Sequence, residues 1–162
     1  HAYNKARYDA ETFWYQGNGA VDIIPDTAFT PRDYTGRDVI LYGHSGSNAV
    51  WNDLLSDSLI QAEDESIIVG NRELNGNSLA CLFVRPRTNS GSASVGVVSA
   101  TGEKGWRLLN NRKYMYPFYN APDFTVYDAY QIGKDKMGIQ AAGYFGIDWS
   151  LEKGEISWKN KK

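Results

Sequence analysis

The loop Gly43-His44-Ser45-Gly46-Ser47 carries the residue types most able to do chemistry in this 162-residue chain. It follows a predicted strand and precedes a predicted helix. In that setting the hydrolase pattern G-x-S-x-G holds a serine nucleophile on a sharp turn. Ser47 stands where the pattern has its last glycine, so the match is partial. The chemistry to consider is therefore acyl transfer by the Ser45 hydroxyl.

A serine hydroxyl becomes a good nucleophile only when a base takes its proton, and that base is usually a histidine. The chain has two histidines, His1 and His44, and neither follows Ser45, whereas the hydrolase histidine comes after the serine. A lysine base at Lys104 or Lys113 stays open, although no spacing favours it. We therefore expect no working triad and keep serine hydrolysis at Ser45 as a minor alternative.

Metal, thiol and cofactor chemistry are not expected either. The sequence lacks a Cys/His cluster and an H-E-x-x-H pattern, and the acidic run Glu63-Asp64-Glu65 lacks the spacing of metal ligands. The single cysteine, Cys81, lies in an apolar run and is predicted to be a small buried side chain. Neither glycine cluster matches the dinucleotide fingerprint or the phosphate loop. We therefore predict no catalytic residue, no metal and no cofactor.

Two loops have the composition of an anion site. Residues 43–48 and 101–105 both follow predicted strands and open predicted helices, so their N–H groups could face a ligand at the positive end of a helix dipole. In open parallel sheets, ligands collect at the carboxyl ends of the strands. The same residue types also cap helices without any ligand, and Arg85 and Arg87, which could join such a site, are equally typical of exposed loops. The candidate ligand-binding residues are Gly43, Ser45, Ser47, Asn48, Thr101 and Gly102.

The apolar pattern predicts helices alternating with strands. Helices are predicted over residues 4–16 and 49–55 and through Trp106, Leu108 and Leu109. Strands are predicted at 21–24, 38–42, 79–84, 95–99, 124–127, 139–145 and 156–158, with a small antiparallel hairpin around Gly70-Asn71. The runs at 79–84 and 95–98 are continuously apolar, as in strands buried on both faces of a parallel sheet. We therefore predict an α/β three-layer sandwich with a mostly parallel, doubly wound (Rossmann- or flavodoxin-like) sheet.

Composition predicts one globular domain over residues 1–162, since 42% of the residues are hydrophobic and 22% are charged. The 5 Trp, 11 Tyr and 6 Phe are typical of an aromatic-rich core and rim, and also of carbohydrate or protein contacts. Basic residues are scattered apart from the tail 159–162, so no nucleic acid partner is expected. No run of 18 apolar residues and no signal peptide is present, so no membrane contact is expected.

Four short sequences carry a resemblance to a known family: A-R-Y-D-A-E-T-F-W-Y at 6–15, G-N-G at 17–19, V-I-L-Y-G at 39–43 and A-G-Y-F-G-I-D-W at 142–149. On these residues the chain resembles the C-terminal region of large secreted bacterial proteins of the prolyl oligopeptidase-like α/β-hydrolase class, over residues 3–149. The resemblance implies that a catalytic domain precedes this region and contains the triad, and that the protein is secreted or periplasmic. The position of Ser45 is usually not a serine in that family, so no family catalytic residue carries over.

The chain begins at His1 without an initiator methionine, and we expect it to be a C-terminal accessory part of a longer polypeptide. The main functional expectation is a noncatalytic accessory or interaction domain that packs on the upstream hydrolase domain of a peptidase- or esterase-like protein. It predicts an exposed apolar patch larger than a few hundred Å². The alternatives are a small anionic-ligand module using residues 43–48 and 101–105, and the minor serine hydrolase using Ser45. Oligomeric state and parent substrate stay open.

Overall fold

Two β-sheets dominate the part of the chain that the computed structural model describes, which is residues 1–88, 90–112, 121–132 and 138–159. The helices are α1 (Ala2–Gly17), α2 (Trp51–Leu55) and α3 (Glu103–Asn110), with 3-10 turns η1 (Asp26–Ala28), η2 (Pro31–Tyr34) and η3 (Ala129–Gln131). The strands are β1 (Val39–Tyr42), β2 (Ile60–Ala62), β3 (Ser66–Val69), β4 (Arg72–Asn75), β5 (Leu79–Pro86), β6 (Ser94–Ala100), β7 (Phe124–Asp128), β8 (Ile139–Tyr144) and β9 (Glu155–Trp158). Lys113 and residues 160–162 of the basic tail lie outside the described residues.

The large sheet has the strand order β1-β6-β5-β7-β8-β9 and is mixed rather than mostly parallel. β1 and β6 pair in parallel, and every other neighbouring pair in this described sheet is antiparallel. The predicted α/β three-layer sandwich with a mostly parallel, doubly wound (Rossmann- or flavodoxin-like) sheet is therefore wrong, since the described residues form mostly β structure with few helices. Residues 87–93 join β5 to β6, and so short a connection makes a hairpin, since parallel neighbours need a crossover of about a dozen residues or more.

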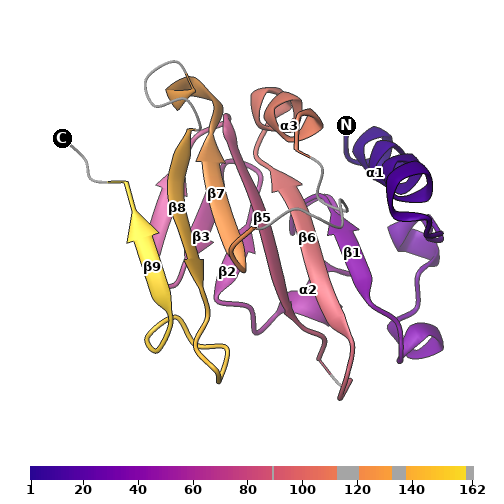
Figure 1. Ribbon diagram of the computed structural model, residues 1–162. Coiled ribbons are helices and arrows are strands. Elements are labelled where there is room, and N and C mark those ends of the chain that lie inside the picture. The colour runs from indigo at the N-terminus through magenta and orange to yellow at the C-terminus, as the bar shows by residue number, and fades with distance from the viewer. Residues whose placement is uncertain (89, 113–120, 133–137, 160–162) are drawn as a thin grey trace.

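The central strands are continuously apolar because both of their faces are covered, and not because they are parallel. Leu79, Cys81 and Phe83 of β5 lie in one core cluster, whereas Ala80 and Leu82 lie in the other. The small sheet and α2 cover the first face, and α3 and α1 lie over the second (Figure 1). A continuous apolar run thus indicates burial on two faces and leaves strand direction undetermined.

The small sheet has the order β2-β3-β4 and is antiparallel throughout. Its β3–β4 hairpin turns at Gly70-Asn71, where the sequence predicts a small hairpin. β2 adds a third strand on the outside of β3, which the sequence does not predict. Ile60, Ala62, Ile67 and Val69 of this sheet are buried against the large sheet.

α1 ends where the sequence predicts, because Gly17-Asn18-Gly19 stops it. Asn18 is left-handed with φ 50°, and a Cβ at Gly19 would lie 2.1 Å from the Phe13 ring. The segment 21–24 that follows is not a strand, contrary to the prediction: its backbone runs past β1 without pairing with it. α2 begins at Trp51, two residues later than predicted. Within the described residues, no helix combines the length and apolar character needed to cross a bilayer.

Candidate functional site

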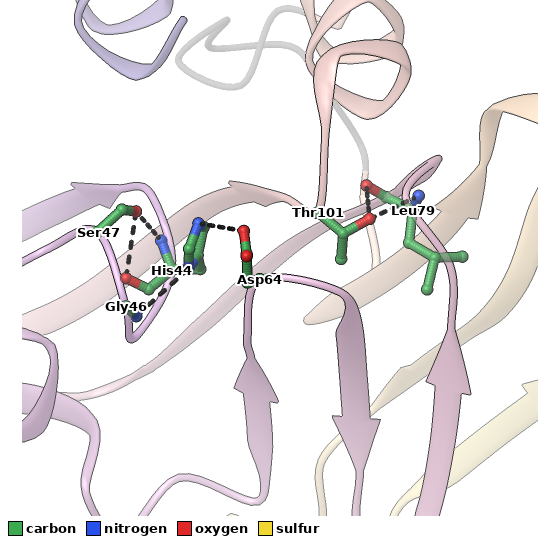
Figure 2. A network of polar contacts seen from close by, with 6 residues as sticks. All are labelled: His44, Gly46, Ser47, Asp64, Leu79 and Thr101. Atoms are coloured by element: carbon green, nitrogen blue, oxygen red, sulfur yellow. Dashed lines mark hydrogen bonds and ion pairs between the residues drawn. The ribbon is translucent and has the colours of Figure 1, made fainter.

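The loops that follow β1 and β6 lie at the same edge of the large sheet, because these two strands are parallel neighbours. Figure 2 shows parts of both, with His44, Gly46 and Ser47 from the first loop and Thr101 from the second. The structure therefore brings the predicted ligand-binding residues of both loops to one edge. Whether they can hold an anion depends on which of their N–H groups are free.

Every backbone N–H group from Gly43 to Ala49 already has a hydrogen-bond partner within the described chain. The acceptors, in order, are the Val98 carbonyl for Gly43, Ser47 Oγ for His44, the Ala62 carbonyl for Ser45, His44 Nδ1 for Gly46, the His44 carbonyl for Ser47 and Asn48, and the Asp26 carboxylate for Ala49. The N···O distance to Asp26 is 2.7 Å. This loop offers no free N–H group to a phosphate or carboxylate, which argues against an anion site there.

Gly43 and Asn48 stabilise the turn that follows β1. Gly43 has φ 123°, and a Cβ there would lie 2.9 Å from Ser47 Oγ, so a side chain would strain the turn. The Asn48 side chain donates to the Tyr42 carbonyl at 3.3 Å and accepts from the Val50 N–H group at 3.1 Å. The glycine and asparagine that suggested a ligand loop are thus explained by closure of the backbone.

Ser45 has no activating base among the residues that the structure describes. The neighbouring His44 ring is occupied: its Nδ1 accepts from the Gly46 N–H group, and its Nε2 lies 3.8 Å from the Asp64 carboxylate (Figure 2). No contact joins either nitrogen to the Ser45 hydroxyl, and Lys104 instead contacts the Tyr130 hydroxyl and ring. This loop therefore resembles a nucleophile turn in its sequence but not in the contacts of its serine.

The second loop is tied to β5 at its first residue. Thr101 donates its N–H group to the Leu79 carbonyl at 3.0 Å, and its Oγ1 accepts from the Leu79 N–H group at 3.1 Å (Figure 2). At Gly102 a Cβ would lie 2.5 Å from the Asn77 carbonyl, so glycine allows the close approach of these backbones. α3 then begins without a side-chain cap, which is a common helix start and by itself identifies no ligand.

Arg85 and Arg87 do not join this edge, since they lie at the opposite end of the β5–β6 hairpin. The Arg87 guanidinium is buried and donates to the backbone carbonyls of Pro31, Tyr34 and Arg37. Arg85 donates to the Asp57 carbonyl at 3.0 Å. Both arginines therefore hold neighbouring chain segments in place.

Metal and thiol sites are not formed by the described residues. No group of three His, Cys, Asp or Glu side chains gathers there at metal-binding distance. Cys81 is buried in the core, as the sequence predicts, and burial raises the pKa of its thiol to about 12. A thiol in that state is not a nucleophile near neutral pH.

The outer side of α1 carries exposed aromatic rings, and it is a feature that the sequence analysis missed. Tyr15 is 83% exposed, Tyr3 64% and Trp14 61%, and Tyr8 is also exposed. At 3.6 residues per turn, Tyr8 lies two turns from Tyr15, and Tyr3 lies three turns from Trp14, so the rings form two rows. We call these four residues the aromatic surface.

The inner side of α1 buries charge instead of apolar side chains. Lys5 and Asp9 are each 1% exposed, and their Nζ and Oδ1 atoms lie 2.5 Å apart. Lys5 also donates to the Arg112 carbonyl at 2.6 Å, and the Tyr42 hydroxyl donates to Asp9 Oδ2 at 2.9 Å. Burial raises the pKa of Asp9, and the neighbouring Lys5 and Tyr42 lower it in part. These contacts join α1 to β1 and to the end of α3.

An apolar groove of about 580 Å³ lies next to the aromatic surface, between α1, the segment 21–29 and β1. Tyr3 belongs to both features, and the exposed Val21 and Ile23 form part of the groove wall. The volume falls within the range of ligand and peptide sites.

The sequence shows that aromatic residues recur at helical spacing in α1 and that Lys5 and Asp9 stand at i and i+4. It does not show which side of the helix faces outward.

No protein-family model, no curated protein and no solved structure matches this chain. The resemblance to the C-terminal region of prolyl oligopeptidase-like hydrolases therefore stays a prediction from the sequence.

Proposed function

We propose that this chain is a noncatalytic interaction domain that packs against the upstream catalytic domain of a secreted or periplasmic, peptidase- or esterase-like α/β-hydrolase protein. The aromatic surface of α1 is the observation that carries the proposal. The identity of the partner and the location rest on the sequence resemblance.

Aromatic rings at high exposure favour a contact surface, because tyrosine and tryptophan dominate the binding energy of protein interfaces. Tyr3, Trp14 and Tyr15 are each more than half exposed on one helix. The exposed Arg7–Glu11 ion pair lies on the same helix at 3.4 Å, so the surface combines apolar rings with a polar pair. Interfaces between domains of one chain have this mixed character.

The contacts of the strand-end loops favour this function over the two alternatives. The N–H groups of residues 43–49 are engaged, which counts against an anion-binding module in that loop. His44 is held by Gly46 and Asp64, which counts against hydrolysis at Ser45. Incubation with a fluorophosphonate probe tests the second alternative, and labelling of Ser45 would contradict a noncatalytic domain.

The coding sequence that precedes His1 gives the first test of the partner. We expect it to encode a hydrolase domain with its own G-x-S-x-G turn and a later histidine. An unrelated preceding sequence would remove the hydrolase partner from the proposal.

Association in trans gives the second test, with the preceding domain and this chain produced separately and mixed in sedimentation velocity experiments. We expect Trp14→Ser combined with Tyr15→Ser to weaken the complex about tenfold or more, since hot-spot aromatics carry at least that much binding energy. Tyr144→Ser is the matched control, because Tyr144 is 53% exposed on β8 and lies outside the aromatic surface. A complex that the double substitution leaves unaffected, or that the control weakens equally, would contradict the proposal.

A further inference from the structure

β1 is the edge strand of the large sheet, and no described strand pairs with its outer side, although the Tyr42 carbonyl at its end accepts from the Asn48 side chain. Gly43 donates its N–H group to Val98 of β6 at 3.1 Å, so alternate residues of β1 direct their backbone groups toward β6 and the residues between them point away. Ile40 belongs to the outward set. Neither its N–H nor its C=O group has a partner among the described residues.

The apolar groove runs along this open edge. All five residues from Asp38 to Tyr42 line it. Successive side chains of a strand point to opposite faces, so a groove that contacts every one of them follows the edge of the strand. The unpaired N–H and C=O groups of Ile40 therefore open into an apolar groove, where a hydrogen-bonding partner is worth more than in open water.

The groove is apolar on both sides of the sheet plane. Ala2, Ala6 and Phe13 of α1 line it on one side. Phe29 and Val50, which pack with the core on the other face of the sheet, line the other side. The small side chains of Ala2 and Ala6 leave room beside the edge, and an occupant would find apolar contacts above and below its backbone.

A carboxylate stands near each end of β1. Asp38 directly precedes the strand and accepts from the Ser94 N–H group at 2.7 Å, and Asp26 accepts from the Ala49 N–H group beyond the end of the strand. The remaining charged residues of the described lining are Asp22 and Arg37, which pair with each other at 3.2 Å. The groove therefore favours a cation at each end. A second copy of β1 would bring its own carboxylates to these positions, so like charges disfavour an edge-to-edge dimer.

We propose that this groove binds an extended peptide segment of a partner protein, which pairs with β1 as a new edge strand. The segment is apolar on both faces and carries a lysine or arginine at each end. β1 has four residues, or about 13 Å at the rise of a strand, which sets the separation of the two cations at roughly four or five residues. This inference does not depend on the hydrolase assignment, because the site is defined by β1 and its groove alone.

The test uses the whole chain and an acetylated, amidated hexapeptide of the sequence lysine, valine, isoleucine, valine, valine, lysine. Amide hydrogen exchange at Ile40 is followed by NMR. We expect about 1 mM peptide to slow this exchange about tenfold. A peptide with an N-methyl group on every internal residue, which leaves neither of its edges able to donate and blocks strand pairing on both, has no effect. A peptide with glutamate at both ends binds more weakly. Unchanged exchange with the lysine peptide, or equal binding of the methylated one, overturns the proposal.

Variants of the chain locate the binding. Ile40→Pro removes only an outward N–H group, which edge strands tolerate, and is expected to weaken binding of the lysine peptide about tenfold, measured from the amide chemical shift of Leu41 because the variant has no amide at residue 40. Ile40→Val keeps the N–H group and is the matched control. Asp26→Asn with Asp38→Asn keeps the acceptor oxygens and lowers affinity for the lysine peptide but not for an uncharged one. If the proline variant fails to fold, the variant with both asparagine substitutions tests the proposal in its place.

Ile40 exchange is also measured without peptide at increasing chain concentration. Protection that grows with concentration identifies a second copy as the occupant and overturns the peptide proposal. Binding that survives Ile40→Pro and both asparagine substitutions places the peptide elsewhere and overturns it as well.

Discussion

α3 packs on the large sheet through apolar side chains, whereas α1, beside it on the same face, buries an ion pair (Figure 1). Trp106, Leu108 and Leu109 of α3 are buried among Leu82, Val98 and Tyr127 of the sheet. In α1 the buried side chains are Lys5 and Asp9, and the four rings of the aromatic surface point outward. Two helices on one face of a sheet thus use opposite means of attachment.

The difference shows how a helix can contribute to two surfaces at once. An apolar stripe that faces the core leaves the outer side of α3 polar, as in an ordinary amphipathic helix. Because charges hold α1 in place, its aromatic residues are available for contacts outside the domain. Buried ion pairs contribute little net stability, but they make removal of one partner costly.

Lys5→Met is expected to have the largest effect among the substitutions that test the difference between α1 and α3. It leaves the Asp9 carboxylate buried without its cation, which should lower the free energy of unfolding by about 3–5 kcal/mol in urea denaturation. Arg7→Met is the matched control, since Arg7 pairs with Glu11 on the exposed side of the same helix. We expect it to change stability by less than about 1 kcal/mol.

Two measurements sharpen the Lys5→Met result. Adding Asp9→Leu should recover part of the lost stability, because it removes the unpaired buried charge, while the contacts of the Tyr42 hydroxyl and the Arg112 carbonyl with this pair stay lost. The destabilisation should also shrink as the pH falls, because burial raises the pKa of Asp9 above its ordinary 3.8 and the folded chain takes up a proton before the unfolded chain does. A loss that is independent of pH and unrelieved by the second substitution would contradict the buried-charge account.

Leu109→Ala tests the apolar attachment of α3. Leu109 is fully buried, so its truncation should cost about 3 kcal/mol from lost contacts and the cavity that remains. The effect should be the same across the pH range in which Lys5→Met varies. Thermal and urea unfolding measure both, and a strong pH dependence at this position would remove the contrast between the two helices.

Tyr42→Phe tests the link between α1 and β1 with a smaller change. It deletes one hydroxyl that donates to Asp9 at 2.9 Å and keeps the ring, so we expect a loss of about 1.5–2 kcal/mol. A double-mutant cycle with Asp9→Asn measures the coupling between the two side chains. Strict additivity would show that the hydrogen bond does not contribute.

The smallest effect on stability is expected on the aromatic surface. Trp14→Ser with Tyr15→Ser should change the free energy of unfolding by no more than about 1 kcal/mol, because both side chains are exposed. The same substitutions are expected to weaken association with a partner domain. A loss of several kcal/mol in the isolated chain would show that these rings stabilise the domain itself.

Local sequence patterns predicted most elements but not their arrangement. α1, β3–β4, β5 and β6 lie close to their predicted positions, because apolar periodicity and glycine-containing turns are local properties. The direction of β5 was mispredicted, because a continuous apolar run is equally compatible with a parallel and an antiparallel strand. The short connection of residues 87–93 is the signal that indicates an antiparallel hairpin. Segment 21–24 has strand composition, yet it lines a groove, because pairing depends on a neighbour and not on composition alone.

The roles of the candidate site residues depend more on tertiary contacts than the elements do. Gly43 and Asn48 were chosen as ligand-loop residues, and the structure uses them to close a turn. The Lys5–Asp9 spacing is visible in the sequence, but such pairs are normally exposed, and Tyr42 lies 33 residues from Asp9. Trp14 lies four residues after Ala10, at helical spacing, yet its side chain is on the solvent side. Only tertiary contacts decide between these possibilities.

The buried thiol of Cys81 in β5 can be used to measure how often the domain opens. Cys81 is the single cysteine of the chain and is shielded on both sides by the core. An alkylating reagent can reach it only when the two sheets separate, so its labelling rate measures how often the domain opens. Every variant described above can be compared by this rate without attaching a dye or adding a probe residue.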